Sequence, residues 1–161
     1  MNNCIVCESS LIEEFYTSDK KKHWKCNTCF AKLLDKIHYV DEEAEKDRYL
    51  EHKNIIDDPG YRKFLSKLSD PLKAKLAPNS KGLDFGCGHG PALEDMLKSD
   101  GFEVDLYDPF FFPNKDIFLK QYDFITCTET VEHFFNPCKE FKTLDTLLLP
   151  GGWLGVMTDF I

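Results

Sequence analysis

Two pairs of cysteines near the start of the chain have the spacing of a metal site. Each pair is a Cys-x-x-Cys motif, and 18 residues lie between Cys4/Cys7 and Cys26/Cys29. Four thiolates form the tetrahedral set that structural Zn²⁺ prefers, and a hairpin-length spacer brings two such turns together. Because the protein fills all four positions, we expect a structural zinc ion, about one per chain. Four reduced cysteines without metal, a redox pair, or His23 as a competing ligand remain as alternatives.

A glycine-rich loop is the second feature whose residues could bind a ligand. The segment GLDFGCGHG places Asp84 ahead of Gly86, Gly88 and Gly90. Glycines allow a sharp turn and a close approach of ligand to backbone, and the N-terminus of the following helix adds oriented N–H groups. Asp108 comes 18 residues after Gly90, where a carboxylate can accept hydrogen bonds from ribose hydroxyls. The Gly-x-Gly-x-Gly spacing favours S-adenosylmethionine (SAM) over NAD. An NAD-dependent oxidoreductase is thus disfavoured, and a tight turn without ligand is the other alternative.

Strand-like and helix-like segments alternate around this loop. Apolar runs predict strands over residues 81–86, 102–107, 122–127 and 153–158, with helices over 91–99 and from 136 to a stop at 150–152. Such alternation predicts an α/β fold with a parallel sheet. Three zones follow from composition: a Cys4 module over residues 1–32, a helical segment over 33–78, and a nucleotide-binding domain over 79–161. Within the second zone we expect a helix from Asp41 to about Ile55, helical spacing from Tyr61 to Leu68, and a further short helix starting at Asp70-Pro71.

Charge and composition restrict the class of protein. The net charge is −8, and the whole excess lies in residues 79–161, with six lysines against fourteen acidic residues. Because an acidic surface repels a phosphate backbone, this distribution argues against a nucleic-acid partner. The sequence has neither an apolar run long enough to span a membrane nor a recognisable secretory signal, which predicts no membrane association. An odd count of seven cysteines, without such a signal, predicts a reducing cytoplasm.

Four segments resemble the class I SAM-dependent methyltransferases. GLDFGCGHGPALEDML resembles their motif I, and VDLYDP resembles their acidic second motif. YDFITCTETVEHFFNP and LLLPGGWLGVMT resemble their fourth and fifth strands. Over its full length the chain resembles bacterial methyltransferases that open with a zinc-ribbon-like module and continue through a helical RYLEHKN…DDPGYRKFL segment. The resemblance implies a Rossmann-like parallel sheet with helices on both faces, preceded by the zinc module and the helical segment.

The resemblance also implies residue roles. Backbone groups of the glycine loop would line the methionine part of SAM, Asp84 would orient that loop, and Asp108 would hold the ribose. The expected cofactor-binding residues are Asp84, Gly86, Cys87, Gly88, Gly90, Asp108, Pro109, Phe110, Thr128 and Glu129. Glu129 and His133 are the candidate catalytic residues, and Glu132, His89 and His52 are further possible acids or bases. The cysteines at 87 and 127 are interpreted as packing residues, not nucleophiles.

Relatives in that family continue past the fifth strand with another helix and two more strands. The present sequence stops at residues 159–161, so we expect the C-terminal strands to be missing. The SAM half would be nearly intact, while much of the acceptor side would be absent, predicting weak turnover and self-association through an exposed sheet edge. A small-molecule methyl acceptor is the expected substrate. A non-catalytic module that acts through a protein partner of its zinc site is the alternative function.

Overall fold

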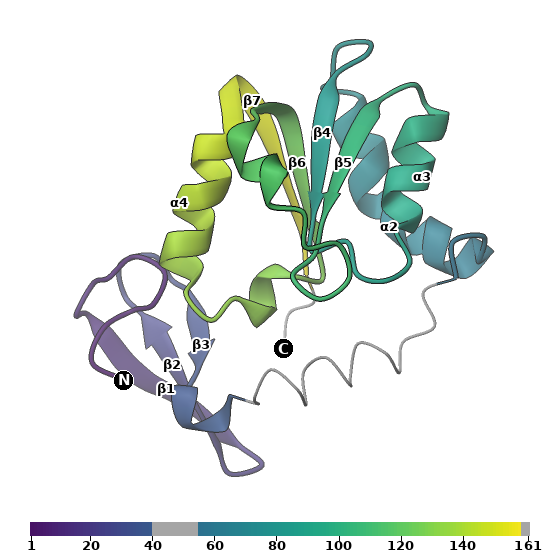
Figure 1. Ribbon diagram of the computed structural model, residues 1–161. Helices are drawn as coiled ribbons and strands as arrows, with labels where there is room; N and C mark the ends of the chain where they lie inside the picture. The colour runs from purple at the N-terminus through teal and green to yellow at the C-terminus, as the bar shows by residue number, and fades with distance from the viewer. Residues whose placement is uncertain (40–54, 159–161) are drawn as a thin grey trace.

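A small antiparallel sheet forms the N-terminal module. The computed structural model describes residues 1–39 and 55–158. Strands β1 (Ile12–Ser18), β2 (Lys21–Cys26) and β3 (Lys32–Leu34) lie in the order β1-β2-β3, followed by the 3₁₀ helix η1 (Lys36–His38). The β1–β2 hairpin turns through Asp19 and Lys20, whose φ angles of 49° and 65° are those of a type I′ turn. Figure 1 shows this module beneath the larger domain.

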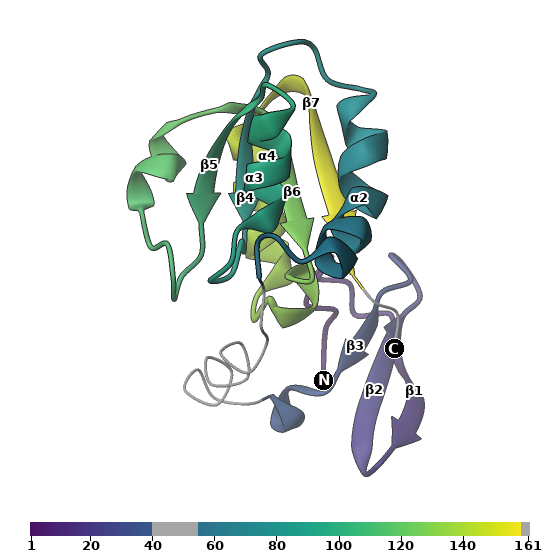
Figure 2. The same ribbon diagram turned by 90° about the vertical axis from the view of Figure 1, so that its right-hand side faces the viewer.

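A parallel four-stranded sheet is the centre of the larger domain. Its strands are β4 (Lys81–Phe85), β5 (Glu103–Tyr107), β6 (Tyr122–Thr128) and β7 (Leu148–Met157). They lie in the order β5-β4-β6-β7 and every neighbouring pair is parallel. The arrowheads of β5, β6 and β7 point towards the end of the sheet at which the N-terminal module lies (Figure 2). Loops that follow the strands therefore face the module's side of the molecule.

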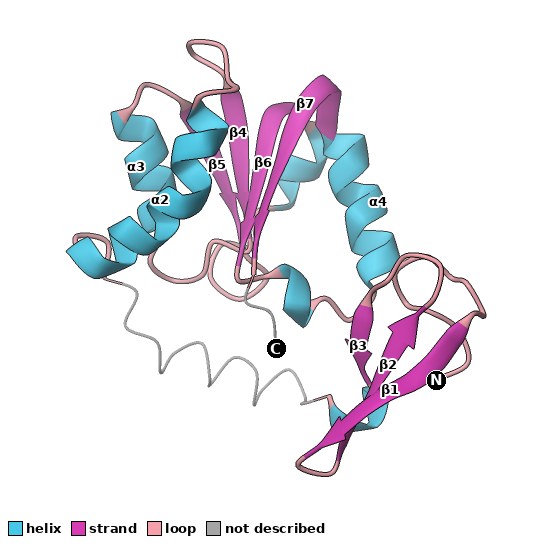
Figure 3. Ribbon diagram, turned by 180° about the vertical axis from the view of Figure 1, so that it is seen from behind, coloured by secondary structure: helices cyan, strands magenta, loops and turns pink. Residues whose placement is uncertain are grey.

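Helices cover both faces of this sheet, as Figure 3 shows. Helices α2 (Pro59–Lys73) and α3 (Ala92–Ser99) lie on one face, and α4 (Pro137–Leu147) lies on the other together with the 3₁₀ helix η2 (Lys115–Leu119). Alternation along β6 explains the two layers, because Phe124 packs among α2 and α3 residues while Ile125 packs towards α4. The expected α/β, Rossmann-like fold is thus confirmed.

The order of the strands reverses beside β4. From β4 the chain crosses through α3 to β5 on one side, then passes through η2 to β6 on the other side of β4. In open α/β sheets, ligands bind outside the carboxyl ends of the strands at this point of reversal. Two segments end there: the glycine loop after β4, and the loop after β6 that contains the short 3₁₀ helix η3 (Val131–His133).

Two predicted element boundaries are wrong. No new helix starts at Asp70, because α2 runs through Pro71 to Lys73, held by buried Leu65 and Leu72 on its inner face. The Pro-Gly-Gly segment 150–152 is not a turn ahead of the last strand but a register shift inside β7, between the pairs Tyr122–Leu148 and Phe124–Trp153. At Pro71, burial of Leu65 and Leu72 outweighs the local preference of proline. At 150–152, pairing of the backbone with β6 on both sides of the segment continues the strand. The helix expected from Asp41 lies almost wholly outside the described residues.

None of the helices in the described part of the chain has the length and apolar character needed to cross a membrane.

Candidate functional site

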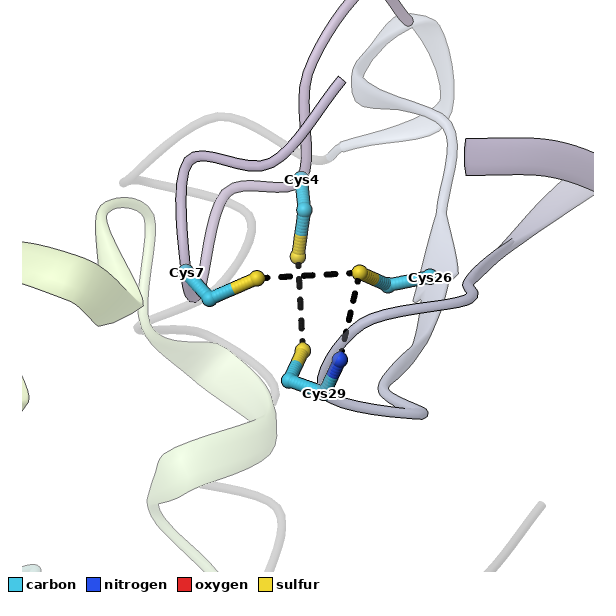
Figure 4. Close-up of side chains that lie close together, drawn as sticks. All are labelled: Cys4, Cys7, Cys26 and Cys29. Carbon is cyan, nitrogen blue, oxygen red and sulfur yellow. Dashed lines mark hydrogen bonds between the residues drawn. The ribbon is translucent and has the colours of Figure 1, made fainter. Parts of the chain in front are cut away.

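The four predicted metal ligands converge on one point (Figure 4). The sulfur atoms of Cys4, Cys7, Cys26 and Cys29 all lie within 4.8 Å of one another. The Cys4–Cys29 and Cys7–Cys26 sulfur distances are 3.7 Å and 3.6 Å. A disulfide requires about 2.05 Å, so neither pair is bonded. Four sulfurs at about 2.3 Å from a tetrahedral Zn²⁺ would lie about 3.8 Å apart, which matches the observed spacing.

Backbone N–H groups favour the thiolate at Cys26, whereas burial raises the pKa of the Cys4 and Cys29 thiols. The amides of Thr28 and Cys29 donate to the Cys26 sulfur at 3.3 Å and 3.5 Å, and the amide of Val6 donates to the Cys4 sulfur at 3.4 Å. The bond from the Cys29 amide is the main reason that the pKa of the Cys26 thiol falls to about 6. A thiolate is the form that binds metal. The cluster contains only cysteines among the described residues, and His23 lies in β2 opposite Tyr16.

The glycine loop and the predicted ribose-binding carboxylate are hydrogen-bonded to each other. The amide of Gly88 donates to Asp108 Oδ2 at 3.0 Å. The other oxygen, Oδ1, accepts from the amides of Phe110 and Phe111 at 2.9 Å and 3.1 Å. Asp108 is only 7% exposed and lies directly after β5. Three of about four acceptor directions of this carboxylate are used, so about one is left for a ligand.

Thr130 is a site residue that sequence reasoning missed. The single proton of its hydroxyl is shared between the carbonyl oxygens of Gly86 and Thr128, at 3.2 Å and 2.9 Å. Gly86 has a φ of 79°, and a Cβ at this position would lie 2.2 Å from the methyl carbon of Thr130. Gly86 is therefore required both by its left-handed backbone and by the threonine packed on it. No pattern in the sequence connects residues 44 positions apart.

Asp84 is buried where β4 meets β6. It is 3% exposed, and the hydroxyl of Thr126 donates to its Oδ1 at 2.7 Å. Burial raises the pKa of this carboxyl to about 7, although the bond from Thr126 opposes the shift. Asp84 thus accepts a hydrogen bond from Thr126 in the neighbouring strand β6, whereas the resemblance implied that it orients the glycine loop. Strongly shifted carboxyl groups are concentrated at functional sites, which makes Asp84 a candidate beyond its structural contact.

Tyr61 is a second missed residue. Its helical spacing with Phe64, Leu65 and Leu68 predicted an apolar packing position, and Tyr61 does pack on the side of the sheet that α2 and α3 cover. Burial is the main reason that the pKa of its phenol is raised to about 12, and the nearby carboxyl groups of Asp84 and Glu129 contribute to this value. The first turn of α2 therefore brings a phenol to the carboxyl ends of β4 and β6. Burial also raises the pKa of the Cys87 thiol, which agrees with a packing role and not a nucleophile.

The end of β6 places two predicted residues at the crevice. Thr128 is the last residue of β6, and its hydroxyl oxygen is buried with no hydrogen-bond partner among the described residues. Glu129 follows with a φ of 49°, and its amide donates to the carbonyl oxygen of Met157 in β7 at 2.7 Å. Non-glycine residues held in this left-handed region mark strain that surrounding structure maintains, often at functional sites.

The remaining predicted residues lie around the same edge. Phe110 follows Asp108, and Phe111 packs on His89 of the glycine loop with ring centroids 5.5 Å apart. Pro109 is exposed, Gly90 is buried, and His133 is exposed at the end of η3. His52 lies outside the described residues. The fold thus brings the glycine loop, Asp108 and the end of β6 to one edge, while His133 lies on its outer side.

Comparison with known families assigns this domain. A family model described as a methyltransferase domain matches residues 49–160, well over half of the chain. The chain belongs to this methyltransferase domain family. The match includes the sheet, its covering helices and the crevice edge, and the cysteine cluster lies ahead of it. A search of curated proteins found no match to the chain.

Proposed function

We propose that the methyltransferase domain binds SAM at the carboxyl ends of β4, β5 and β6 and transfers its methyl group to a small-molecule acceptor. The observation that carries this proposal is the bond between the Gly88 amide and the Asp108 carboxylate. It joins the glycine loop, which lies at the point where the strand order reverses, to the predicted ribose site after the neighbouring strand β5. Methyl transfer in general follows from membership of the family.

The polar groups at this edge fit the parts of such a cofactor. Asp108 keeps about one free acceptor direction, which suits a ribose hydroxyl. The buried hydroxyl of Thr128 has no protein partner in the described residues, so a ligand atom at the end of β6 would satisfy it. Tyr61 of α2 is near enough to Asp84 and Glu129 for their charges to act on its phenol. SAM would thus lie across the ends of β4 and β5, with its methionine part towards β6.

A sulfonium supplies an activated methyl group and leaves as a neutral thioether. The chain's own residues then need to bind, align and exclude water, which is catalysis by proximity. A base is required only if the acceptor atom must lose a proton. We assign that role, where it is needed, to Glu129, which lies at the end of β6, with His133 as the second candidate. The acidic surface of residues 79–161 favours a small acceptor over a polyanion.

We also propose that the cysteine cluster holds one structural zinc ion. The sulfur spacing fits a closed tetrahedral site with no position left for substrate. The ion would hold the loops that carry Cys4–Cys7 and Cys26–Cys29, in a module whose apolar core is otherwise small.

Calorimetric titration of the zinc-loaded chain with SAM tests the main proposal. We expect a Kd between about 1 μM and 1 mM, a range typical of enzyme ligands. Asp108→Asn should weaken binding at least about tenfold, since a hydrogen bond to a charged group contributes roughly 1.5–3 kcal/mol. Asp105→Asn is the matched control, because Asp105 lies in β5, the strand that Asp108 directly follows, but bonds Lys120 and Tyr122. Absence of SAM binding at 1 mM, or equal losses in both variants, would reject the site.

A further inference from the structure

The first turn of α4 depends on the zinc module for a hydrogen bond. A helix leaves the N–H groups of its first turn without partners inside the helix. In α4 the first residue is Pro137, which has no N–H, and the amide of Lys139 donates to the side chain of the N-cap Asn136 at 3.2 Å. The amide of Cys138 instead donates to the carbonyl oxygen of Ile5 at 3.0 Å. Ile5 lies between the metal ligands Cys4 and Cys7, so the metal-binding turn completes the cap of α4.

Two side-chain contacts reinforce this junction. The rings of Tyr39 and Phe135 meet edge to face, with centroids 5.8 Å apart, one residue ahead of the N-cap of α4. Lys142 lies 3.7 Å from Glu8, but both side chains are more than 70% exposed, so this ion pair contributes little. Figure 1 shows the start of α4 resting on the N-terminal module. The contacts that matter at this junction are therefore the backbone hydrogen bond from Cys138 to Ile5 and the aromatic contact between Tyr39 and Phe135.

The segment held by this junction is the loop of the proposed active site. It runs from the end of β6 at Thr128 to the start of α4 at Pro137. Its upstream end is fastened by Glu129 to Met157 and by Thr130 to Gly86. Its downstream end is fastened where Phe135 and α4 meet the module. Loss of either anchor would free the backbone that carries the candidate base and the contact with the glycine loop.

We propose that the metal-loaded Cys4–Cys7 turn is a positioning element for the β6–α4 loop, so that zinc occupancy and SAM binding are coupled. Ile5, through its carbonyl oxygen, and Tyr39, through its ring, are the positioning residues. The inference rests on the proposed function for its zinc ion and for its SAM readout. The link from the Cys4–Cys7 turn to the loop stands on the contacts of α4 alone.

The ion matters because the apolar core around the turn is small. The buried residues of this core are Leu33 and the two metal ligands Cys4 and Cys26, with partly buried apolar residues packed against them. The turn has two backbone hydrogen bonds of its own, from Cys4 to Ser9 and from Glu8 to Cys4. Without metal, the four closely spaced sulfurs lose the ion that joins them, and small zinc modules of this kind commonly unfold. The Ile5 carbonyl would then leave the Cys138 amide, and the first turn of α4 would fray.

Hydrogen exchange on the full chain, with zinc and after removal by chelator, tests the link directly. We expect amides of residues 129–138 to exchange at least about tenfold faster without zinc, while amides of β4 stay within about twofold. Unchanged exchange in residues 129–138 while the module itself loses protection would overturn the proposal. The same samples titrated with SAM should show at least about fivefold weaker binding without zinc. If neither sample binds SAM, the proposed function fails, and the exchange result still decides the link.

A variant that keeps the metal guards against general unfolding of the zinc-free chain. Tyr39→Ala removes the ring contact with Phe135 and leaves the four cysteines in place. Tyr16→Ala is its matched control, because Tyr16 is an exposed tyrosine of the same module, on the β1 hairpin and in contact with His23. With zinc bound, we expect faster exchange over residues 134–138 in Tyr39→Ala alone. Equal exchange in the two variants would overturn the positioning role of Tyr39.

Discussion

The hydroxyl of Thr130 donates to the carbonyl oxygen of Gly86 at 3.2 Å, which fastens the loop after β6 directly to the glycine loop after β4. The two loops come from strands that are neighbours in the sheet but separated by α3, β5 and η2 along the chain. The contact is close because Gly86 has no side chain, and Thr130 occupies the place that a Cβ would take. The crevice of the proposed SAM site is therefore closed on one side by a packed threonine.

Gly86→Ala should destabilise the fold more than an ordinary glycine substitution. The left-handed backbone costs an alanine about 1–2 kcal/mol, and the clash with Thr130 adds about 1–3 kcal/mol of overpacking. Gly101→Ala is the matched control, since its φ of 91° carries the same backbone cost with nothing within 4 Å of the added Cβ. Denaturant unfolding of both variants measures the difference. Equal losses of unfolding free energy would show that the Thr130 contact is unimportant.

Local patterns in the sequence were enough to predict the cysteine cluster and the glycine loop. Both depend on short spacings, and the turn or strand that presents each group is adjacent to it in the chain. The pairing of Gly88 with Asp108 was also within reach, because neighbouring parallel strands end at one edge. Thr130 and Tyr61 were not, because their places depend on which strand lies beside β4 and on how α2 crosses the sheet.

The errors in the sequence-based prediction have the same origin. Proline at 71 and the glycines at 151 and 152 are local signals for an end or a turn. In the folded chain, Leu72 buries itself against α3 residues, and Phe124 pairs with Trp153 beyond the glycines. Those contacts are non-local, so the sequence signals alone could not predict that the helix and the strand continue.

The pH dependence of stability should identify Asp84. Its pKa is raised from 3.8 to about 7 in the folded chain, so the unfolded state loses this proton at lower pH than the folded state. The contribution of the neutral carboxyl is full below about pH 4 and is lost as the pH rises to about 7, on the order of 4 kcal/mol. Asp84→Asn does not titrate. We therefore expect its unfolding free energy, relative to wild type, to rise across that range.

Asp105→Asn serves as the control of opposite sign. Burial alone would raise the pKa of Asp105, but hydrogen bonds from Lys120 and Tyr122 outweigh it and lower the pKa. That carboxylate stabilises the fold above its unfolded pKa, and the benefit is lost as the pH falls. The difference between Asp105→Asn and wild type should thus shrink in acid. Denaturant midpoints from pH 3.5 to 8 measure both variants, and parallel curves for Asp84→Asn and wild type would contradict the assignment.

Zinc binding should depend on Cys4 and not on Cys138. Cys4→Ser removes one of four ligands from the closed site, and we expect the chain to lose metal or to bind it at least about tenfold more weakly. Cys138→Ser changes a cysteine outside the sulfur cluster. Its backbone amide donates a hydrogen bond to the Ile5 carbonyl oxygen, so it lies next to the metal-binding turn. Elemental analysis after dialysis should find about one zinc in this control and in wild type. A metal-free wild type, prepared with zinc supplied, would reject the site.

The outer edge of β7 should make the 161-residue chain associate. Among the described strands β7 has a neighbour only in β6, and its apolar side chains Trp153, Leu154 and Val156 are 37–44% exposed. An open edge of this kind offers unpaired backbone groups to a second chain, and a charged residue placed on it opposes such pairing. Leu154→Lys should therefore shift the chain towards monomer at about 100 μM, whereas Leu119→Lys, in exposed η2, should not. Sedimentation velocity over a concentration series measures this, and a wild-type chain that stays monomeric throughout would contradict the prediction.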